Sequence, residues 1–127
     1  MPKTILLIED DLPTIDVYQT AFKEAKFKLE VITSGEKAIE RMKEKRSPKP
    51  DLILLDLLLP DINGIQVLEA IRKQEETKDL PVFILTNYTS QQLKEAGYDL
   101  KSEKFLLKTD YTPRQLVELV RERLKND

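Results

Sequence analysis

The sequence predicts an open α/β domain, in which helices cover both faces of a five-stranded parallel sheet. Five short apolar or alternating runs take turns along the 127 residues with five segments that carry apolar residues at helical spacing. Alternation of this kind is typical of parallel βαβ units. Two of the runs end directly at acidic residues, which places carboxylates where such sheets bind ligands. The length suits one compact domain over residues 1–127.

The predicted strands are buried runs, and one of them has the character of an edge strand. Continuous apolar runs are typical of strands covered on both faces. The second run alternates enough to lie nearer the sheet edge, and the third is the most apolar. Of the two common doubly wound orders, five strands favour 2-1-3-4-5, the flavodoxin-like arrangement. The five strands are expected at residues 4–8, 28–33, 52–55, 81–85 and 105–107.

The predicted helices begin at residues that cap helix N-termini well. Asp11 precedes Leu12-Pro13, Ser34 and Asn63 are single caps, and Thr89–Gln92 and Thr112–Gln115 read as capping boxes. The fourth helix is weak, because it has few apolar residues before a glycine ends it. In the other four helices the residues expected on the inner face are Ile15, Tyr18, Phe22, Ala25, Ala38, Ile39, Met42, Ile65, Leu68, Ile71, Leu116, Leu119, Val120 and Leu124. The fourth helix has only Leu93 and Ala96 as apolar residues.

The composition excludes several classes of function. Lys and Arg number 21 against 23 Asp and Glu, with a net charge of −2 and no basic face for nucleic acid or a membrane surface. Without cysteine there are no disulfides or thiolate metal sites, and without histidine there is no imidazole catalysis by the chain itself. The N-terminal apolar run is too short for a signal peptide or a membrane span, so we expect a cytoplasmic protein.

Reactive side chains follow four of the five predicted strands. Glu9 and Asp10 follow the first, Asp56 the third, Thr86 the fourth and Lys108 the fifth. Four of them have an ordinary role when taken alone: the first two acids could cap a helix, the threonine could be a strand residue and the lysine a solvated one. Asp56 is harder to explain in this way, because no helix begins directly after it. Because the carboxyl ends of parallel strands meet at one edge, we expect all five to lie close together.

This combination indicates magnesium and phosphoryl chemistry. Three clustered carboxylates repel one another unless a cation neutralises them or their pKa values rise. Oxygen ligands without His or Cys favour a hard cation, and carboxylates with water suit Mg²⁺. An aspartate such as Asp56 can be a nucleophile that becomes an aspartyl phosphate, while the metal, Lys108 and Thr86 stabilise the transferring oxygens.

Together these residues resemble the response regulator receiver domain of two-component signalling, over the entire chain. The resemblance rests on IEDD after the first strand, on Asp56, Pro60 and Gly64 in the pattern D-x-x-x-P-x-x-x-G, on Thr86 in ILT, and on Lys108 in FLLK. Each fragment is weak alone, but their order and their places at strand ends make the set specific.

The resemblance implies a role for each of these residues. Asp56 would be the phosphoacceptor, supplied by a histidine kinase or a phosphotransfer protein. Glu9, Asp10, Asp56 and the backbone carbonyl of Leu58 would bind Mg²⁺, with Thr86 and Lys108 contacting the phosphoryl group. Phe105 would occupy the aromatic switch position, where the Thr86 hydroxyl turns toward the phosphoryl group and the aromatic ring turns inward.

The implied output is a change of surface rather than an enzymatic reaction on a separate substrate. Phosphorylation would shift the surface of the fourth helix, fifth strand and fifth helix and so control a protein partner. Such a domain assists its own phosphorylation and dephosphorylation. The resemblance also allows a phosphorylation-dependent dimer and implies no contact of this domain with nucleic acid or membrane.

Four features depart from the usual pattern. Thr109 follows Lys108 where proline is usual, and since a cis bond before a non-proline residue costs about 2.5–4 kcal/mol, we expect a trans bond. Gly97 shortens the fourth helix, and Phe105 lacks the hydroxyl of the usual tyrosine. Leu58 and Asn87 flank the expected pocket, and we hypothesise that their bulk limits the attacking water and slows dephosphorylation.

Three other interpretations compete with this one. A phosphatase of the haloacid-dehalogenase type needs an acid two residues after the nucleophile, where this chain has Leu58. A pseudo-receiver, acting as a phosphorylation-independent interaction module, normally loses an acid or the lysine, and this chain keeps them. A receiver from a longer regulator with a DNA-binding domain would have the same sequence here, although we expect a stand-alone regulator.

Overall fold

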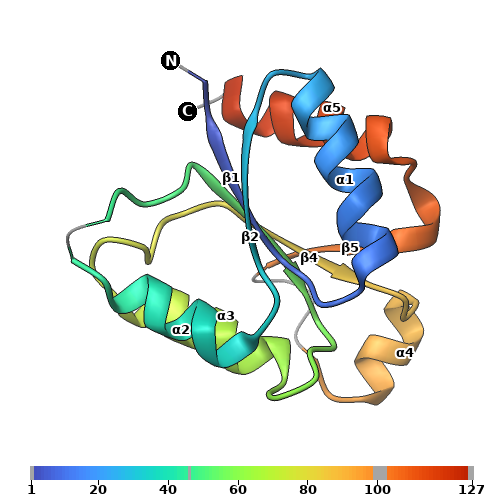
Figure 1. The fold of residues 1–127 in the computed structure, drawn as a ribbon. Helices are drawn as coiled ribbons and strands as arrows, with labels where there is room; N and C mark the ends of the chain where they lie inside the picture. The colour runs from blue at the N-terminus through green and yellow to red at the C-terminus, as the bar shows by residue number, and fades with distance from the viewer. Residues whose placement is uncertain (1, 46, 99–102, 126–127) are drawn as a thin grey trace.

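The computed structural model describes residues 2–45, 47–98 and 103–125, which form a five-stranded parallel sheet of order β2-β1-β3-β4-β5 (Figure 1). The predicted order and the position of the second strand at an edge are therefore confirmed. The strands are β1 (Thr4–Ile8), β2 (Lys28–Ile32), β3 (Leu52–Asp56), β4 (Val82–Thr86) and β5 (Lys104–Leu107). The helices are α1 (Leu12–Glu24), α2 (Gly35–Lys43), α3 (Gly64–Lys73), α4 (Ser90–Glu95) and α5 (Pro113–Lys125), with a 3-10 turn η1 (Lys108–Asp110).

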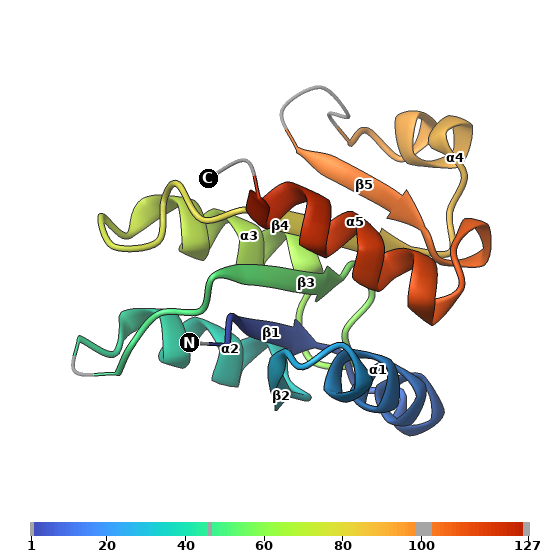
Figure 2. The same cartoon turned by 90° about the horizontal axis from the view of Figure 1, so that it is seen from above.

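The helices lie in two layers, one on each side of the sheet. Figures 1 and 2 show α1 and α5 together on one side and α2 and α3 on the other. Successive strand residues point to opposite faces, so Ile5 and Leu7 pack with α1 and α5 while Leu6 and Ile8 pack with α2 and α3. All four side chains are fully buried, which explains why this strand is apolar throughout. None of the helices in the described part of the chain is both long and apolar enough to cross a membrane.

The predicted N-caps are confirmed at all five helices. The carboxylate of Asp11 accepts a hydrogen bond from Thr14 N, and the Ser34 hydroxyl accepts one from Lys37 N. The other three caps are capping boxes, in which a polar side chain at N3 also accepts from the cap's own N–H. These three boxes begin at Asn63, Thr89 and Thr112.

Helix α4 is as short as the sequence predicts. Gly97 has a φ of +89°, a conformation that L side chains rarely adopt, and Tyr98 N donates to Leu93 O across it at 3.0 Å. This closes the helix after six residues. Leu93 is its buried residue and packs against the cluster on the α2 and α3 side of the sheet. Residues 99–102, between this turn and β5, lie outside the described residues.

The chain leaves β5 through a trans peptide bond between Lys108 and Thr109, as predicted. No described residue follows a cis bond. The backbone then makes the 3-10 turn η1 in place of the proline-bearing loop that the resemblance implied. This turn places Lys108 directly at the carboxyl end of β5, where its side chain reaches the strands beside it.

Candidate functional site

A cavity of about 550 Å³ opens at the carboxyl ends of the strands, where the strand order reverses between β1 and β3. Open α/β sheets bind ligands at this point, because the loops on either side of it diverge. Six of the residues that line the cavity were predicted from the sequence to form or flank the site: Glu9, Asp10, Asp56, Leu58, Asn87 and Lys108. The structure therefore brings together the predicted acids, the lysine and the two flanking residues.

The three acids form one cluster with different degrees of burial. Carboxylate oxygens of Glu9, Asp10 and Asp56 all lie within 4.8 Å of one another. Glu9 and Asp56 are buried, at 1% and 6% exposed, whereas Asp10 is exposed. Glu9 Oε2 accepts from the backbone N–H groups of Asp10 and Asp11, at 3.1 and 3.2 Å. The turn after β1 thus orients the Glu9 carboxylate, and the cavity side of the cluster is left open.

Lys108 is the counter-charge of this cluster. Its ammonium donates to Glu9 Oε1 at 2.7 Å and lies 3.4 Å from Asp56 Oδ1. Burial would lower the pKa of Lys108, but the hydrogen bond with Glu9 and the charges of both acids outweigh it and raise the pKa. Burial, and then the neighbouring Glu9 charge, raise the pKa of Asp56 from 3.8 to about 7 despite the lysine. One ammonium therefore does not fully compensate the acids, and the cluster is suited to bind a further cation.

The loop after β3 folds back on itself beside the cluster. Gly64 N donates to Leu57 O at 2.8 Å, and Leu58 pairs with Asn63 in an isolated antiparallel bridge. Leu58 N also donates to Asp56 Oδ1 at 3.3 Å. A Cβ on Gly64 would lie 2.6 Å from the backbone oxygen of Asp56, so a side chain there would push the acid's own backbone. The glycine in the sequence pattern is therefore required by this close approach.

Asp61 ties the same loop to the N-terminus of α2. Its carboxylate accepts from the Ser34 hydroxyl at 2.8 Å and from Gly35 N and Glu36 N, both at 2.9 Å. The two backbone hydrogen bonds are the main reason that the pKa of Asp61 lies well below its usual range. Nothing in the local sequence pattern shows that Asp61 caps a helix that precedes it in the chain.

Thr86 and Phe105 lie on neighbouring strands behind the cavity. Thr86 ends β4 one residue after Leu85, which pairs with Asp56 on β3. Its side chain is buried and is not among those that line the cavity, and its hydroxyl oxygen accepts from Tyr88 N at 3.0 Å. Phe105 pairs with Ile84 and is partly buried against the cluster on the α2 and α3 side. Among the described residues no hydrogen bond joins the Thr86 hydroxyl to the acids, so its predicted role requires that this side chain turn.

Two aromatic residues of the cavity were not predicted to be there. Tyr18 was expected to face inward from the first helix, and it does so while also lining the cavity. Burial raises the pKa of Tyr18. Tyr111 follows η1 and lines the cavity beside Thr109. No periodicity marks such a loop residue in the sequence.

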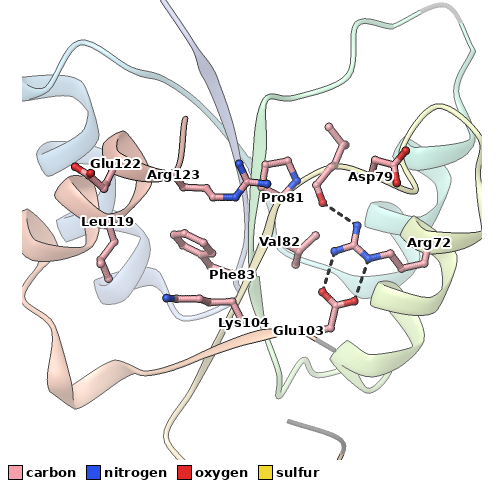
Figure 3. Close-up of a pocket in the computed structure, with 11 residues that line it drawn as sticks. Arg72, Asp79, Pro81, Val82, Phe83, Glu103, Lys104, Leu119, Glu122 and Arg123 are labelled. Carbon is pink, nitrogen blue, oxygen red and sulfur yellow. Dashed lines mark hydrogen bonds and ion pairs between the residues drawn. The ribbon is translucent and has the colours of Figure 1, made fainter. Parts of the chain in front are cut away.

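A second cavity, of about 530 Å³, lies at the other end of β4 and β5, and Figure 3 shows its residues. Arg72 lines this cavity, and its Nε and Nη2 donate to the Glu103 carboxylate at 3.0 and 2.8 Å. Arg72 Nη1 donates to Lys78 O and Leu80 O at 2.9 and 2.7 Å. These bonds join the end of α3, the loop before β4 and the start of β5, so we interpret this pair as structural.

The geometry defines a doubly wound α/β domain with an acidic, lysine-bearing pocket at its switch point. A family model described as the response regulator receiver domain matches residues 5–121. The chain therefore belongs to the receiver domain family of response regulators in two-component signalling.

Individual relatives agree with this assignment. The DNA-binding response regulator MtrA of Mycobacterium tuberculosis H37Rv is 31% identical over 127 residues, which are 100% of this chain and 53% of MtrA. A crystal structure of a putative response regulator from Chloroflexus aurantiacus has a TM-score of 0.82 at 28% identity, and the match covers 98% of this chain and 99% of that one. The chain spans about half the length of the curated relatives it matches.

A more distant structure shares the fold. The receiver domain of a sensor histidine kinase from Pseudomonas aeruginosa PAO1 has a TM-score of 0.82 at 22% identity, and the match covers 98% of this chain and 99% of that one. That structure is described as having a magnesium ion coordinated in its active site cleft.

Proposed function

We propose that the chain accepts a phosphoryl group on Asp56 from a phosphohistidine of a histidine kinase or phosphotransfer protein, with Mg²⁺ as cofactor. The observation that carries this proposal is the cluster itself. Three carboxylates from two adjacent strand ends lie within 4.8 Å of one another, and a lysine from a third strand end contacts two of them. These 127 residues contain no histidine, so the phosphohistidine lies outside them.

The donor set fits Mg²⁺. Glu9, Asp10 and Asp56, with the backbone carbonyl of Leu58, would supply only oxygen ligands, which hard cations prefer. When bound, Mg²⁺ would offset the repulsion of the acids and the charge on the phosphoryl oxygens. The magnesium described for the Pseudomonas receiver domain supports this choice by analogy of fold alone.

The transfer itself needs an ionised Asp56 close to a positive charge. A carboxylate oxygen of Asp56 attacks phosphorus, the P–N bond of the phosphohistidine breaks, and its electron pair stays on the imidazole nitrogen. The Lys108 ammonium, 3.4 Å from Asp56 Oδ1, favours the ionised carboxylate and is placed to stabilise charge on the phosphoryl oxygens. The cavity leaves this side of Asp56 open to a donor.

The proposed output is a change in the surface formed by α4, β5 and α5. Thr86 would give up its hydrogen bond with Tyr88 N and turn toward the phosphoryl group, and Phe105 would turn further inward. Phosphorylation would thus shift an existing equilibrium between two surface states that a protein partner distinguishes. In this proposal the domain is a switch that assists its own modification and acts on no separate substrate.

The test is modification by a small phosphodonor. The protein is incubated with acetyl phosphate, with and without Mg²⁺, and its intact mass is measured. We expect one added phosphoryl group only with Mg²⁺, none in Asp56→Asn, and wild-type behaviour in the matched control Asp16→Asn, an exposed acid on α1. A wild type that stays unmodified with Mg²⁺ would refute the proposal and favour a pseudo-receiver. Modification that persists in Asp56→Asn would refute Asp56 as the acceptor.

A further inference from the structure

The loop at residues 57–63 is held from both sides, and its backbone carries the group expected to complete the metal site. Leu58 pairs with Asn63 across the loop, and Gly64 N donates to Leu57 O at 2.8 Å. The position of the Leu58 backbone therefore depends on where Asn63 is held. Contacts made by Asn63 bear on the pocket even though its side chain does not line it.

On one side the loop is fixed to α2. Asp61 accepts three hydrogen bonds from the first turn of that helix. A Cβ on Gly35 would lie 2.4 Å from Ile62 Cγ1, so the helix and the loop are in close contact here. Helix α2 packs in turn along α3, so this side of the loop is held against the pair of helices on that face of the sheet.

On the other side the loop is joined to the end of α4 by one hydrogen bond. Asn63 Oδ1 accepts from Ile65 N at 2.8 Å, which is its capping role, while Nδ2 donates to the Tyr98 hydroxyl at 3.1 Å. Only the side-chain oxygen of Asn63 is needed to cap the helix, so its amide nitrogen can donate a separate hydrogen bond. Tyr98 N bonds Leu93 O, so the tyrosine belongs to the turn that closes α4. Figure 1 shows that this turn passes beside the loop between β3 and α3.

We propose that Asn63 and Tyr98 are positioning residues: their hydrogen bond holds the 57–63 loop in place for metal binding and couples the pocket to α4. The inference rests on the proposed function, since it concerns the same magnesium and phosphoryl site. Coupling between two sites is reciprocal, so an interaction through which α4 affects metal affinity also lets the metal and phosphoryl group affect α4. Helix α4 suits such a role because it is short: it has six residues, and Leu93 is the side chain that it buries.

The predicted effect is moderate. One hydrogen bond between neutral groups near the surface corresponds to about a two- to tenfold change in an equilibrium constant. We therefore expect Tyr98→Phe to weaken Mg²⁺ binding by about twofold to tenfold. Asn63→Ser keeps a capping oxygen and removes the amide, so it is expected to weaken binding similarly. Tyr88→Phe is the matched control, because it removes a hydroxyl from a neighbouring loop that makes no described contact with Asn63.

The measurement is calorimetric titration of the purified proteins with MgCl₂. The effect of Tyr98→Phe on Mg²⁺ affinity is measured in three backgrounds: the wild type, Asn63→Ser and Asn63→Asp. Each comparison is made within one background, so the charge added by the aspartate is present on both sides and cancels. We expect the effect in the wild type and in Asn63→Asp, whose carboxylate can still accept from the tyrosine hydroxyl. We expect no effect in Asn63→Ser. Thermal unfolding of each variant separates a loss of affinity from a loss of fold.

A second readout follows α4 directly. Hydrogen exchange of the backbone amides at the end of α4 is compared with and without Mg²⁺ and beryllofluoride, which stands in for the phosphoryl group. We expect a ligand-dependent change in exchange in the wild type and a smaller change in Tyr98→Phe.

The outcomes separate this inference from the proposed function. If the wild type binds Mg²⁺ and Tyr98→Phe binds it equally well, the positioning role is overturned and the phosphoacceptor proposal stands. The same holds if the effects of Tyr98→Phe and Asn63→Ser simply multiply, because a shared hydrogen bond can be lost only once. If the wild type binds no Mg²⁺, the proposed function fails and this inference fails with it.

Discussion

The most informative single substitution is Asp56→Asn, studied by stability in the presence of a chelator. The pKa of Asp56 is raised from 3.8 to about 7, chiefly by burial and then by Glu9. For an acid, a folded pKa above the unfolded pKa means that the folded state binds its proton more tightly. The resulting stabilisation is fully present below pH 3.8 and is lost as the pH rises through about 7. Above that pH the wild type has a buried carboxylate that the variant lacks.

The size of the effect follows from the two pKa values. At about 1.36 kcal/mol per pKa unit, the difference between 3.8 and about 7 corresponds to roughly 4 kcal/mol. The cavity admits water, which screens the charge, so we expect about half of this, roughly 2 kcal/mol. For a domain of this size that raises the melting temperature of Asp56→Asn above that of the wild type by about 7 °C at pH 8.

Urea and thermal unfolding, followed by circular dichroism at pH 4 and pH 8 with EDTA, test this expectation. Asp56→Asn is predicted to exceed the wild type in stability at pH 8 and to match it closely at pH 4. Adding Mg²⁺ at pH 8 is predicted to stabilise the wild type more than the variant, because only the wild type keeps all three carboxylates. An advantage of Asp56→Asn that is equal at both pH values would refute the assignment of a raised pKa to this residue.

Three further predictions concern the surroundings of the site. Asp61→Asn lowers the urea midpoint at neutral pH, and because the folded pKa of Asp61 is depressed, the difference from the wild type shrinks as the pH falls below 3.8; a difference that grows there would contradict this. Leu58→Ala and Asn87→Ala each shorten the lifetime of the aspartyl phosphate, measured by intact mass over time, since smaller side chains admit the attacking water; unchanged lifetimes would count against this. Arg72→Met lowers the free energy of unfolding by about 1–3 kcal/mol, because the ion pair with Glu103 is lost, while acetyl phosphate still modifies Asp56. If the variant is as stable as the wild type, the pair is not structural.

The fold could be predicted from the sequence because its elements carry strong local signals. Each strand is a short apolar or, for β2, alternating run, and each helix begins at a capping residue that the structure confirms. The strand order then fixed which side chains meet. Glu9 and Lys108 are 99 positions apart in the chain, yet both follow strands directly, so their meeting at 2.7 Å follows from topology alone.

The contacts made by loop residues could not be predicted in the same way. Asp61 caps α2 from 25–27 positions further along the chain, and Asn63 meets Tyr98 over 35 positions. Neither pair follows a strand or shares a helix face, so no periodicity relates its members. Their meeting depends on how far each loop extends from the sheet edge, which is decided by packing rather than by local pattern. The hydrogen bond from Tyr88 N to the Thr86 hydroxyl could not be predicted from the sequence either, because the pattern does not determine the orientation of this hydroxyl.

The placement of the aromatic hydroxyl groups makes this protein its own optical probe. The chain has four tyrosines and no tryptophan. Tyr18 and Tyr111 line the acidic cavity, Tyr88 donates its N–H to Thr86, and Tyr98 bonds the loop that follows Asp56. All four therefore lie at the carboxyl edge of the sheet, and no tyrosine lies at the opposite end. Any change in intrinsic ultraviolet emission on adding a metal or phosphodonor thus arises at the pocket or its exit toward α4, without an introduced label.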